Sequence, residues 1–337
     1  MKITKTCFTI LIASLLTLGF SQSNALSFEQ VLELAERNSA NVATASTNYA
    51  SASRDLSRIQ ADPLALRIPI MQAEQALQRA ANNLQAGKLS ARNTAASAFA
   101  GAKEKDSALH IAQMNLKIAQ TTLDATKIRF NAGAATRLEL EKAQNGLASA
   151  ENQLADAQQA RNLAYDNLGS LIAVSDFVLS DKVTIGEVPS IETVLAGLAQ
   201  NSQMMNAQHA LALAEAQLAA TDNAFSARKN IEAAKDRVNN ARTTLAETQR
   251  SLEISLKQSH NAVLAAQGRL QTAQSSLSTA QSDFEAQQLR FNAGSISPLQ
   301  LAQSELALAN SQAQLEMARH AFAAGLRQLD LAILGAR

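Results

Sequence analysis

One pentapeptide occurs twice in this sequence. The letters RFNAG stand at 129–133 and again at 290–294, an offset of 161 positions (290 − 129). At the same offset, apolar residues that follow the first copy correspond to apolar residues that follow the second. These pairs are Leu138 with Leu299, Leu140 with Leu301, Leu147 with Leu308, and Leu154 with Leu315. A similar correspondence occurs further upstream at an offset of 163 (201 − 38). There Val31-Leu32 corresponds to Val194-Leu195, and Asn38-Ser39 corresponds to Asn201-Ser202. The chain is therefore expected to contain two copies of one folding unit.

Within each copy, apolar residues repeat every seven positions. The longest run is Leu256, Val263, Leu270, Leu277, Phe284 and Phe291. Further runs are Leu245, Leu252, Ala266, Ala273 and Ala280, with Ser259 as a polar member; Ala95, Ala102, Leu109, Leu116, Leu123 and Phe130; and Leu301, Leu308, Leu315, Phe322 and Leu329. A sustained 3.5-residue period predicts helices that supercoil and interlock their side chains. Each RFNAG sequence, with its glycine at a tight turn, is expected to join two such helices into an antiparallel hairpin. A plain coiled-coil spacer has the same periodicity and is the alternative.

The composition favours long helices over a wide globular core. Only 4% of the residues are aromatic, there is no Trp, and stretches rich in Ala, Leu, Gln, Lys and Glu separate the prolines. Pro63 and Pro69, Pro189 and Pro298 fall in three narrow windows, where turns or first helical turns tolerate proline. The expected helices run from Phe28 to about Gln60, from about Met71 to Arg129, from about Thr136 to Leu168, from Ser190 to about Ala220, from about Arg228 to Arg290, and from Pro298 to about Leu334.

The sequence thus predicts an all-α fold of long antiparallel coiled-coil hairpins in tandem. One hairpin repeat is expected at residues 26–168 and the second at 190–337. The connecting segment at 169–189 alternates and is rich in β-branched residues, which predicts two short strands. A helix of about 60 residues spans roughly 90 Å, which is longer than a compact globule of this mass needs.

The first 25 residues have the pattern of a secretory signal peptide. Lys2 and Lys5 precede an apolar stretch from Thr6 to Phe20, and Ser23-Asn24-Ala25 offers small residues for cleavage. An uncleaved membrane anchor is the alternative, but the apolar stretch is shorter than the ~20 residues of a spanning helix. We expect an exported protein, periplasmic or associated with the outer membrane. Because Cys7 is the only cysteine and lies in this segment, no disulfide or cysteine metal site is expected.

The remaining residues exclude several functional classes. Lys and Arg number 30 against 29 Asp and Glu, without basic clusters, which argues against nucleic acid as a partner. The histidines are isolated and are interpreted as polar helix positions; they are His110, His209, His260 and His320. Met204-Met205 is interpreted as core, and Glu104, Asp106, Glu139 and Glu141 as solvated helix faces. No catalytic, cofactor-binding or metal-binding constellation is found, so an enzyme is not expected.

The two-hairpin arrangement resembles the TolC-like outer-membrane efflux family over essentially the whole mature chain. The resemblance rests on LSFEQVLELAERNS at 26–39, its echo SIETVLAGLAQNS at 190–202, and the two RFNAG turns. In that family, three protomers pool their hairpins into a helical tube whose turns meet a membrane-fusion adaptor and an inner-membrane pump. The resemblance implies a homotrimer with adaptor-facing tip residues at Arg129, Gly133, Leu138, Arg290, Gly294 and Leu299. For the two arginines, a favourable interaction with the helix macrodipole is the alternative to adaptor contact.

The chain also departs from the family pattern. The family inserts two amphipathic strands per half between its short and long helices, whereas the windows here are ADPLALRIPI at 61–70 and TDNAFSARKN at 221–230. A membrane strand needs ~9–11 alternating residues, so little or no β-barrel is expected and outer-membrane association stays open. Gln300 and Gln303 stand where familiar members have aspartates, which argues against an acidic ring. The resemblance implies an efflux or export duct; a barrel-less periplasmic scaffold without transport activity is the alternative.

Overall fold

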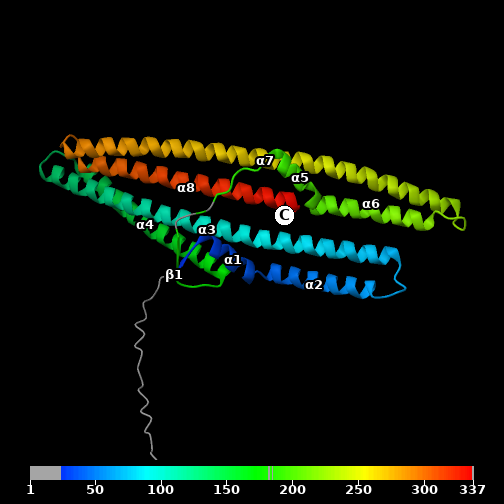
Figure 1. The fold of residues 1–337 in the computed structure, drawn as a ribbon. Coiled ribbons are helices and arrows are strands. Elements are labelled where there is room, and N and C mark those ends of the chain that lie inside the picture. The colour runs from blue at the N-terminus through cyan, green and yellow to red at the C-terminus, as the bar shows by residue number, and fades with distance from the viewer. Residues whose placement is uncertain (1–23, 181–182, 184, 336–337) are drawn as a thin grey trace, which may run out of the picture.

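The computed structural model describes residues 24–180, 183 and 185–335. The expected leader at 1–25 therefore lies almost entirely outside the described residues. Figure 1 shows a long, nearly all-helical rod with both hairpins running along it. The elements are β1 (Asn24–Leu26), α1 (Phe28–Asn38), α2 (Ala40–Gln60), α3 (Arg67–Asn131), α4 (Arg137–Ile172), β2 (Phe177–Leu179), α5 (Ile191–Ala196), the 3-10 helix η1 (Gly197–Gln200), α6 (Ser202–Thr221), α7 (Arg228–Asn292) and α8 (Pro298–Leu334).

The long helices lie side by side in a single row. On the half that contains the RFNAG turns, α4 packs on α3, α3 on α8, and α8 on α7. On the other half, α2 takes the place of α4 and α6 the place of α8. Helices α3 and α7 have 65 residues each and run the whole length, roughly 100 Å. The predicted all-α fold of long antiparallel hairpins is confirmed.

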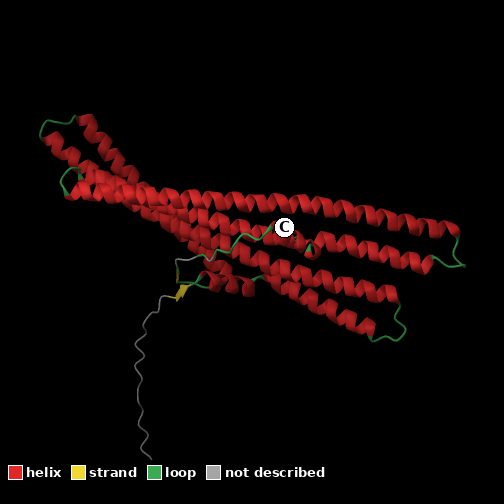
Figure 2. Ribbon diagram, turned by 45° about the horizontal axis from the view of Figure 1, so that its top comes forward, coloured by secondary structure: helices red, strands yellow, loops and turns green. Residues whose placement is uncertain are grey.

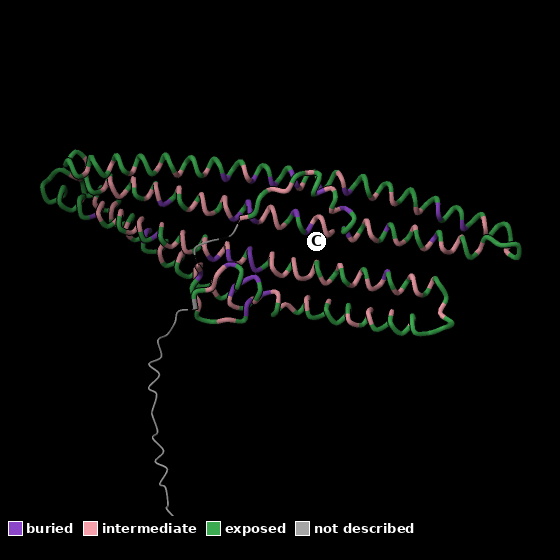
Figure 3. Tube along the Cα trace, in the orientation of Figure 1, coloured by how far each residue is buried: buried purple, intermediate pink, exposed green. Residues whose placement is uncertain are grey.

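The heptad pattern marks the packed side of these helices. Along α7, Leu256 and Val263 are each only 1% exposed, and Leu252, Ala266 and Leu270 are also buried. Nearer the RFNAG turn the same register is half-buried, and Figure 3 shows burial concentrated in the middle of the rod. A helix of a single-layer row buries only the stripes that face its neighbours, so most of its other positions remain polar and exposed.

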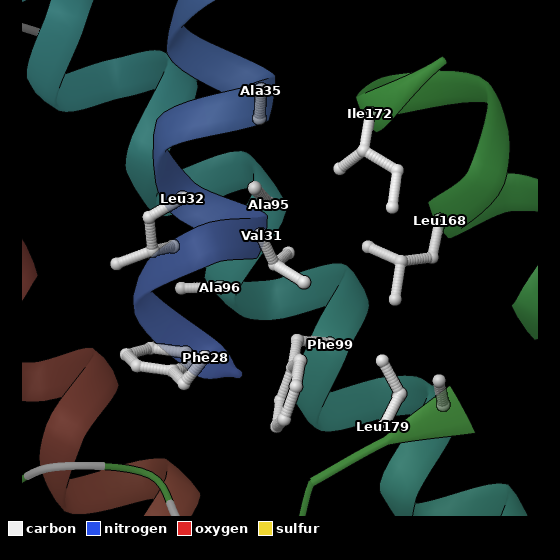
Figure 4. Close-up of a cluster of buried hydrophobic side chains, with 11 residues drawn as sticks. Phe28, Val31, Leu32, Ala35, Ala95, Ala96, Phe99, Leu168, Ile172 and Leu179 are labelled. Atoms are coloured by element: carbon white, nitrogen blue, oxygen red, sulfur yellow. The ribbon is translucent and has the colours of Figure 1, made fainter. Parts of the chain in front are cut away.

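Each half has its own apolar cluster near the middle of the rod. In the first, Val31 of α1 packs against Leu168 and Ile172 of α4, and Phe28 meets the edge of Phe99 with ring centroids 5.2 Å apart (Figure 4). In the second, Val194 of α5 and Leu329 of α8 belong to one cluster. These positions correspond in the duplication, since Val31 and Val194 are 163 apart and Leu168 and Leu329 are 161 apart. The repeat therefore extends from the sequence pattern to the packing.

Two predicted helices are interrupted where the duplicated Asn-Ser pair occurs. The expectation of one helix from Phe28 to Gln60 was wrong, because Ser39 takes an extended backbone and its hydroxyl accepts from the Val42 amide to cap α2. Likewise, Asn201 ends η1 and caps α6 inside the segment expected to be a single helix from Ser190 to Ala220.

The same asparagines bind the ends of the returning helices. The Asn38 Nδ2 donates to the Ile172 carbonyl at 2.6 Å, and the Asn201 Nδ2 donates to the Ala332 carbonyl at 3.0 Å. Asn201 is fully buried. Ile172 is the last residue of α4, where carbonyls lack partners within the helix, so Asn38 satisfies a group that would otherwise be unpaired. The Ala332 carbonyl also accepts from the Gly335 amide at 3.1 Å, so Asn201 gives it a second hydrogen bond. We call these two sites the asparagine junctions.

The connecting segment at 169–189 also differs from the prediction. Helix α4 continues to Ile172, and among the described residues of the segment only β2, Phe177–Leu179, is a strand. Its partner is β1, with Asn24 opposite Phe177 in a parallel register. Alternation within the segment predicted a strand but could not show that the partner precedes α1.

Proline does not delay the start of α3. The helix was expected from about Met71, yet it begins at Arg67 and includes Pro69 in its first turn. The N–H groups of a first turn have no partner within the helix, so proline removes no hydrogen bond there. The long helices also extend to Asn131 and Asn292, two residues beyond the expected ends at Arg129 and Arg290.

A polar cluster joins α3 to α4. Asp106 was expected on a solvated face, but its carboxylate is half-buried and accepts from Arg161 Nε and from the Tyr165 hydroxyl, each at 2.7 Å. The guanidinium of Arg161 also lies 4.3 Å from the centre of the Tyr165 ring. Burial, and then the hydrogen bond to Asp106, raise the pKa of Tyr165 to about 12. No sequence pattern indicated this cluster, because Arg161 and Tyr165 stand 55 and 59 positions from Asp106.

Substitutions of two leucines of α7 test whether the buried heptad positions contribute most to the free energy of unfolding. We expect Leu256→Ala, at a position only 1% exposed, to lower the free energy of unfolding by about 2–5 kcal/mol, because it removes buried methyl groups and leaves a cavity. The matched change Leu289→Ala, at a 71% exposed position of the same helix, should cost less than about 0.5 kcal/mol. Urea unfolding followed by circular dichroism measures both, and similar losses in the two variants would contradict the packing.

Candidate functional site: the hairpin tips

The two RFNAG turns have the same backbone geometry. Gly133 has φ +73° and Gly294 has φ +71°, in the left-handed region that favours glycine. The amide of Ala134 donates to the Arg129 carbonyl at 2.7 Å, and the amide of Ser295 donates to the Arg290 carbonyl at 2.8 Å. This is a Schellman closure, which satisfies the last carbonyls of α3 and α7 and reverses the chain.

The helices that leave the turns begin with matching caps. Thr136 forms a capping box with Glu139 at the start of α4, and Ser297 forms one with Gln300 at the start of α8. Gln300 thus occupies the capping position that Glu139 occupies in the first tip. Hydrogen bonds from the Thr136 backbone, and then from its hydroxyl, lower the pKa of Glu139 below its ordinary value of 4.5.

Each tip exposes an apolar side chain next to its arginine. Ile128 and Leu289, which precede the two RFNAG sequences, are each 71% exposed. Leu138 is 59% exposed, whereas its counterpart Leu299 is half-buried. Sequence reasoning selected the leucines but missed Ile128 and Leu289. Their signal was an apolar residue outside the heptad register, immediately before the arginine in both copies.

The two arginines differ in what they contact. Both lie in the last turn of a long helix, where the macrodipole favours a cation. Arg129 donates from its guanidinium to the Ala134 carbonyl at 3.3 Å, so it helps to close its own turn. Within the described residues, the Arg290 side chain has no hydrogen bond or ion pair. The macrodipole interpretation therefore applies to both, and only Arg290 keeps all its donors free.

The six predicted tip residues lie in two neighbouring turns and in the first turns of the helices that follow them. Figures 1 and 2 show both turns at the same end of the rod, one on each hairpin. Arg129, Gly133 and Leu138 belong to the α3–α4 turn, and the other three belong to the α7–α8 turn. Each turn thus combines an arginine with an exposed apolar side chain, Ile128 in the first and Leu289 in the second.

The histidines do not gather into a site. His260 and His320 are buried, not simply polar positions on helix surfaces, and a ring nitrogen of His260 lies 2.9 Å from the Pro189 carbonyl oxygen. Burial lowers the pKa of His320. Over residues 24–180, 183 and 185–335, no group of three or more His, Cys, Asp or Glu could hold a metal ion. In the same part of the chain, no helix is both long and apolar enough to span a membrane.

The fold is that of the helical outer-membrane channels. A membrane protein from Pseudomonas aeruginosa is similar with a TM-score of 0.64 and 12% identity, over 92% of this chain and 90% of that one. The CmeC outer membrane channel of Campylobacter jejuni also gives 0.64 and 12%, over 99% and 94%. The outer membrane protein VceC of Vibrio cholerae gives 0.58 and 15%, over 92% and 96%. No curated protein matches the chain in sequence.

The chain belongs to the outer membrane efflux protein family. The family model matches residues 65–174 and 221–335, which is more than half of the sequence. Each matched stretch contains one long helix, one RFNAG turn and one returning helix, so the family pattern occurs once in each hairpin. Membership defines an efflux protein of the outer membrane and cell envelope, and not an enzyme.

Glycine-to-alanine substitutions are expected to have opposite effects on stability in the turns and within the helices. We expect Gly133→Ala and Gly294→Ala each to destabilise the protein by about 1–2 kcal/mol, because alanine is strained at positive φ. Gly268→Ala is the control: it lies within α7 with no neighbouring atom near an added Cβ, and it should stabilise by about 0.5–1 kcal/mol. Thermal unfolding of the three variants gives the signs, and stabilisation by Gly133→Ala would refute the turn geometry.

The unlike capping boxes predict an acid response in one tip only. Since the pKa of Glu139 is lowered by folding, its stabilising contribution is complete above 4.5 and is lost as the pH falls through the folded pKa. The protection of the first turn of α4 against hydrogen exchange, corrected for the intrinsic pH dependence of exchange, should therefore decrease as the pH falls below 4.5. Gln300 does not titrate, so the first turn of α8 should show no such additional change, and an equal response in both tips would exclude this cause.

Proposed function

We propose that three copies of this chain close into a helical tube that forms or extends a periplasmic efflux duct. The observation that supports this most directly is the single-layer row of helices. Its interior helices have neighbours on two sides, but α7 at one edge and α4 with α2 at the other each have a flank that no other long helix covers. A row with two open edges is a segment of wall, and further copies can continue it.

The edges have side chains suited to such contacts. Ile254 and Leu264 on α7 are 58% and 44% exposed, and Leu163 on α4 is 61% exposed. Burying apolar side chains of this size is favourable by about 1.5–3 kcal/mol each. The exposed remainder of α7 is rich in Gln, Asn, Ser and Thr, which would line a water-filled passage without holding solutes tightly.

The tips would be the docking end of this duct. Arg290 has free donors, and Ile128 and Leu289 offer equivalent apolar contacts on both hairpins. Three copies would present six turns of similar shape, which suits a membrane-fusion adaptor that binds repeated sites and, through it, an inner-membrane pump. In this proposal Arg129, Gly133, Leu138, Arg290, Gly294 and Leu299 shape the adaptor-facing surface, with both glycines acting through the turn.

Oligomeric state tests the duct directly. We expect light scattering of the purified protein to give three times the chain mass, and Ile254→Glu and Leu163→Glu to shift it toward the monomer, because each places a charge at an inter-copy contact. The control Leu64→Glu, in a loop at the other end of the rod, should leave the trimer intact. A strict monomer at every concentration would contradict the duct and favour a periplasmic spacer.

The tips can be tested in the same protein by cross-linking. Cys7, in the expected leader, is the only cysteine, so Leu138→Cys and Leu299→Cys give single reactive sites in the mature chain. In intact cells we expect these variants to cross-link to a membrane-fusion adaptor identified by mass spectrometry, whereas Leu64→Cys should not. Trimers whose tips give no adaptor adduct would leave the tube but refute the docking surface.

A further inference from the structure

The end of the rod opposite the tips consists of two short loops, residues 61–66 and 222–227, which we call the far-end loops. Figures 1 and 2 show both at the same end. Leu64 and Leu66 in the first loop are 86% and 73% exposed, and Phe225 in the second is 101% exposed. These are the highest values among the large apolar side chains of the described residues. The most solvent-exposed apolar groups thus gather at one end.

Both loops satisfy the amide of the projecting residue from within. The Leu64 amide donates to Asp62 Oδ1 at 2.9 Å, and the Phe225 amide donates to Asn223 Oδ1 at 3.0 Å. The side-chain acceptor stands two residues before the apolar residue in each case. An unpaired amide is costly to move out of water, so this closure lowers the cost of placing Leu64 and Phe225 in an apolar medium.

Cations stand immediately behind the apolar side chains. Arg67 is the first residue of α3, and Arg228 and Lys229 are the first two of α7; all three are exposed. Within the described residues, none of the three has an ion-pair partner. Neither helix has an acidic residue in its first turn, although the macrodipole favours acids and disfavours cations there. Helix stability therefore does not explain these cations. Asp62 and Asp222 are the acids of the two loops, which leaves a modest positive excess.

We infer that the far-end loops seat this end of the rod on an anionic phospholipid surface. Leu64, Leu66 and Phe225 enter the boundary between headgroups and acyl chains, and the cations contact the headgroup phosphates. A lipid surface suits these loops better than a protein partner does, because their apolar side chains project separately from two convex turns. A bilayer interface accepts such groups without a complementary pocket. This attachment goes beyond the duct and does not depend on trimer formation.

A single reporter measures the insertion. The sequence has no Trp, so Phe225→Trp introduces one fluorophore at the proposed contact. With vesicles of phosphatidylethanolamine and phosphatidylglycerol, its emission should shift to shorter wavelength and be quenched by brominated acyl chains. Ile128→Trp, at the opposite end of the rod, is the control and should do neither. An unchanged Phe225→Trp spectrum, or an equal shift in the control, would overturn the inference.

Vesicle flotation measures the affinity. The combined variant Leu64→Ser, Leu66→Ser and Phe225→Ser should bind roughly tenfold more weakly or worse, since three apolar side chains no longer enter the interface. Replacing Arg67, Arg228 and Lys229 by Gln should weaken binding to anionic vesicles and reduce its salt dependence. The matched control Ile128→Ser, Leu138→Ser and Leu289→Ser should bind like the wild type. Equal binding to phosphatidylcholine vesicles at all salt concentrations would refute the anionic requirement, and loss of binding only in the control would refute the location.

Discussion

The structure depends on apolar side chains spaced at 3.5 residues that pack between neighbouring antiparallel helices in one layer. A compact bundle directs all such side chains to one centre, whereas this row directs them sideways, from α4 through α3 and α8 to α7. The consequence is a rod with little thickness and a large exposed surface. Most of its stability comes from the seams between adjacent helices and from the two clusters near the middle. Because each helix has neighbours only within this one layer, the long helices remain exposed to solvent along their length.

The duplication is exact in some features and relaxed in others. Turn geometry, caps, the asparagine junctions and the central clusters recur in both halves. The polar cluster of Asp106, Arg161 and Tyr165 does not, because the positions 161 residues later are Gln267, Phe322 and Leu326. Phe322 is buried in the second cluster. The two hairpins therefore hold their helices together by different means at the same level, one with a half-buried ion pair and the other with apolar packing.

Much of this fold could be predicted from the sequence because its information is local and periodic. The seven-residue repeats predicted the long helices, and the glycine of the repeated RFNAG sequence predicted the turns that join them. The breaks at Ser39 and Asn201 were missed because Ser and Asn are ordinary on a helix surface, and only the distant carbonyls of Ile172 and Ala332 give the asparagines their partners. The pairing of β1 with β2 was missed for the same reason. At the tips, the turn residues were predictable, but the exposure of Ile128 and Leu289 depends on where α4 and α8 return.

The asparagine junctions have a mechanical consequence. At the middle of the rod the chain is discontinuous on two of its four tracks, where α1 and α2 meet the end of α4 and where η1 and α6 meet the end of α8. Only α3 and α7 cross this level without a break. A torque applied at the RFNAG end therefore reaches the other end through these two helices. On the two interrupted tracks the helix ends are joined by side-chain hydrogen bonds, from Asn38 at the first joint and from Asn201 and Ser202 at the second. The middle of the rod is therefore the level at which the fewest continuous helices carry a twisting load.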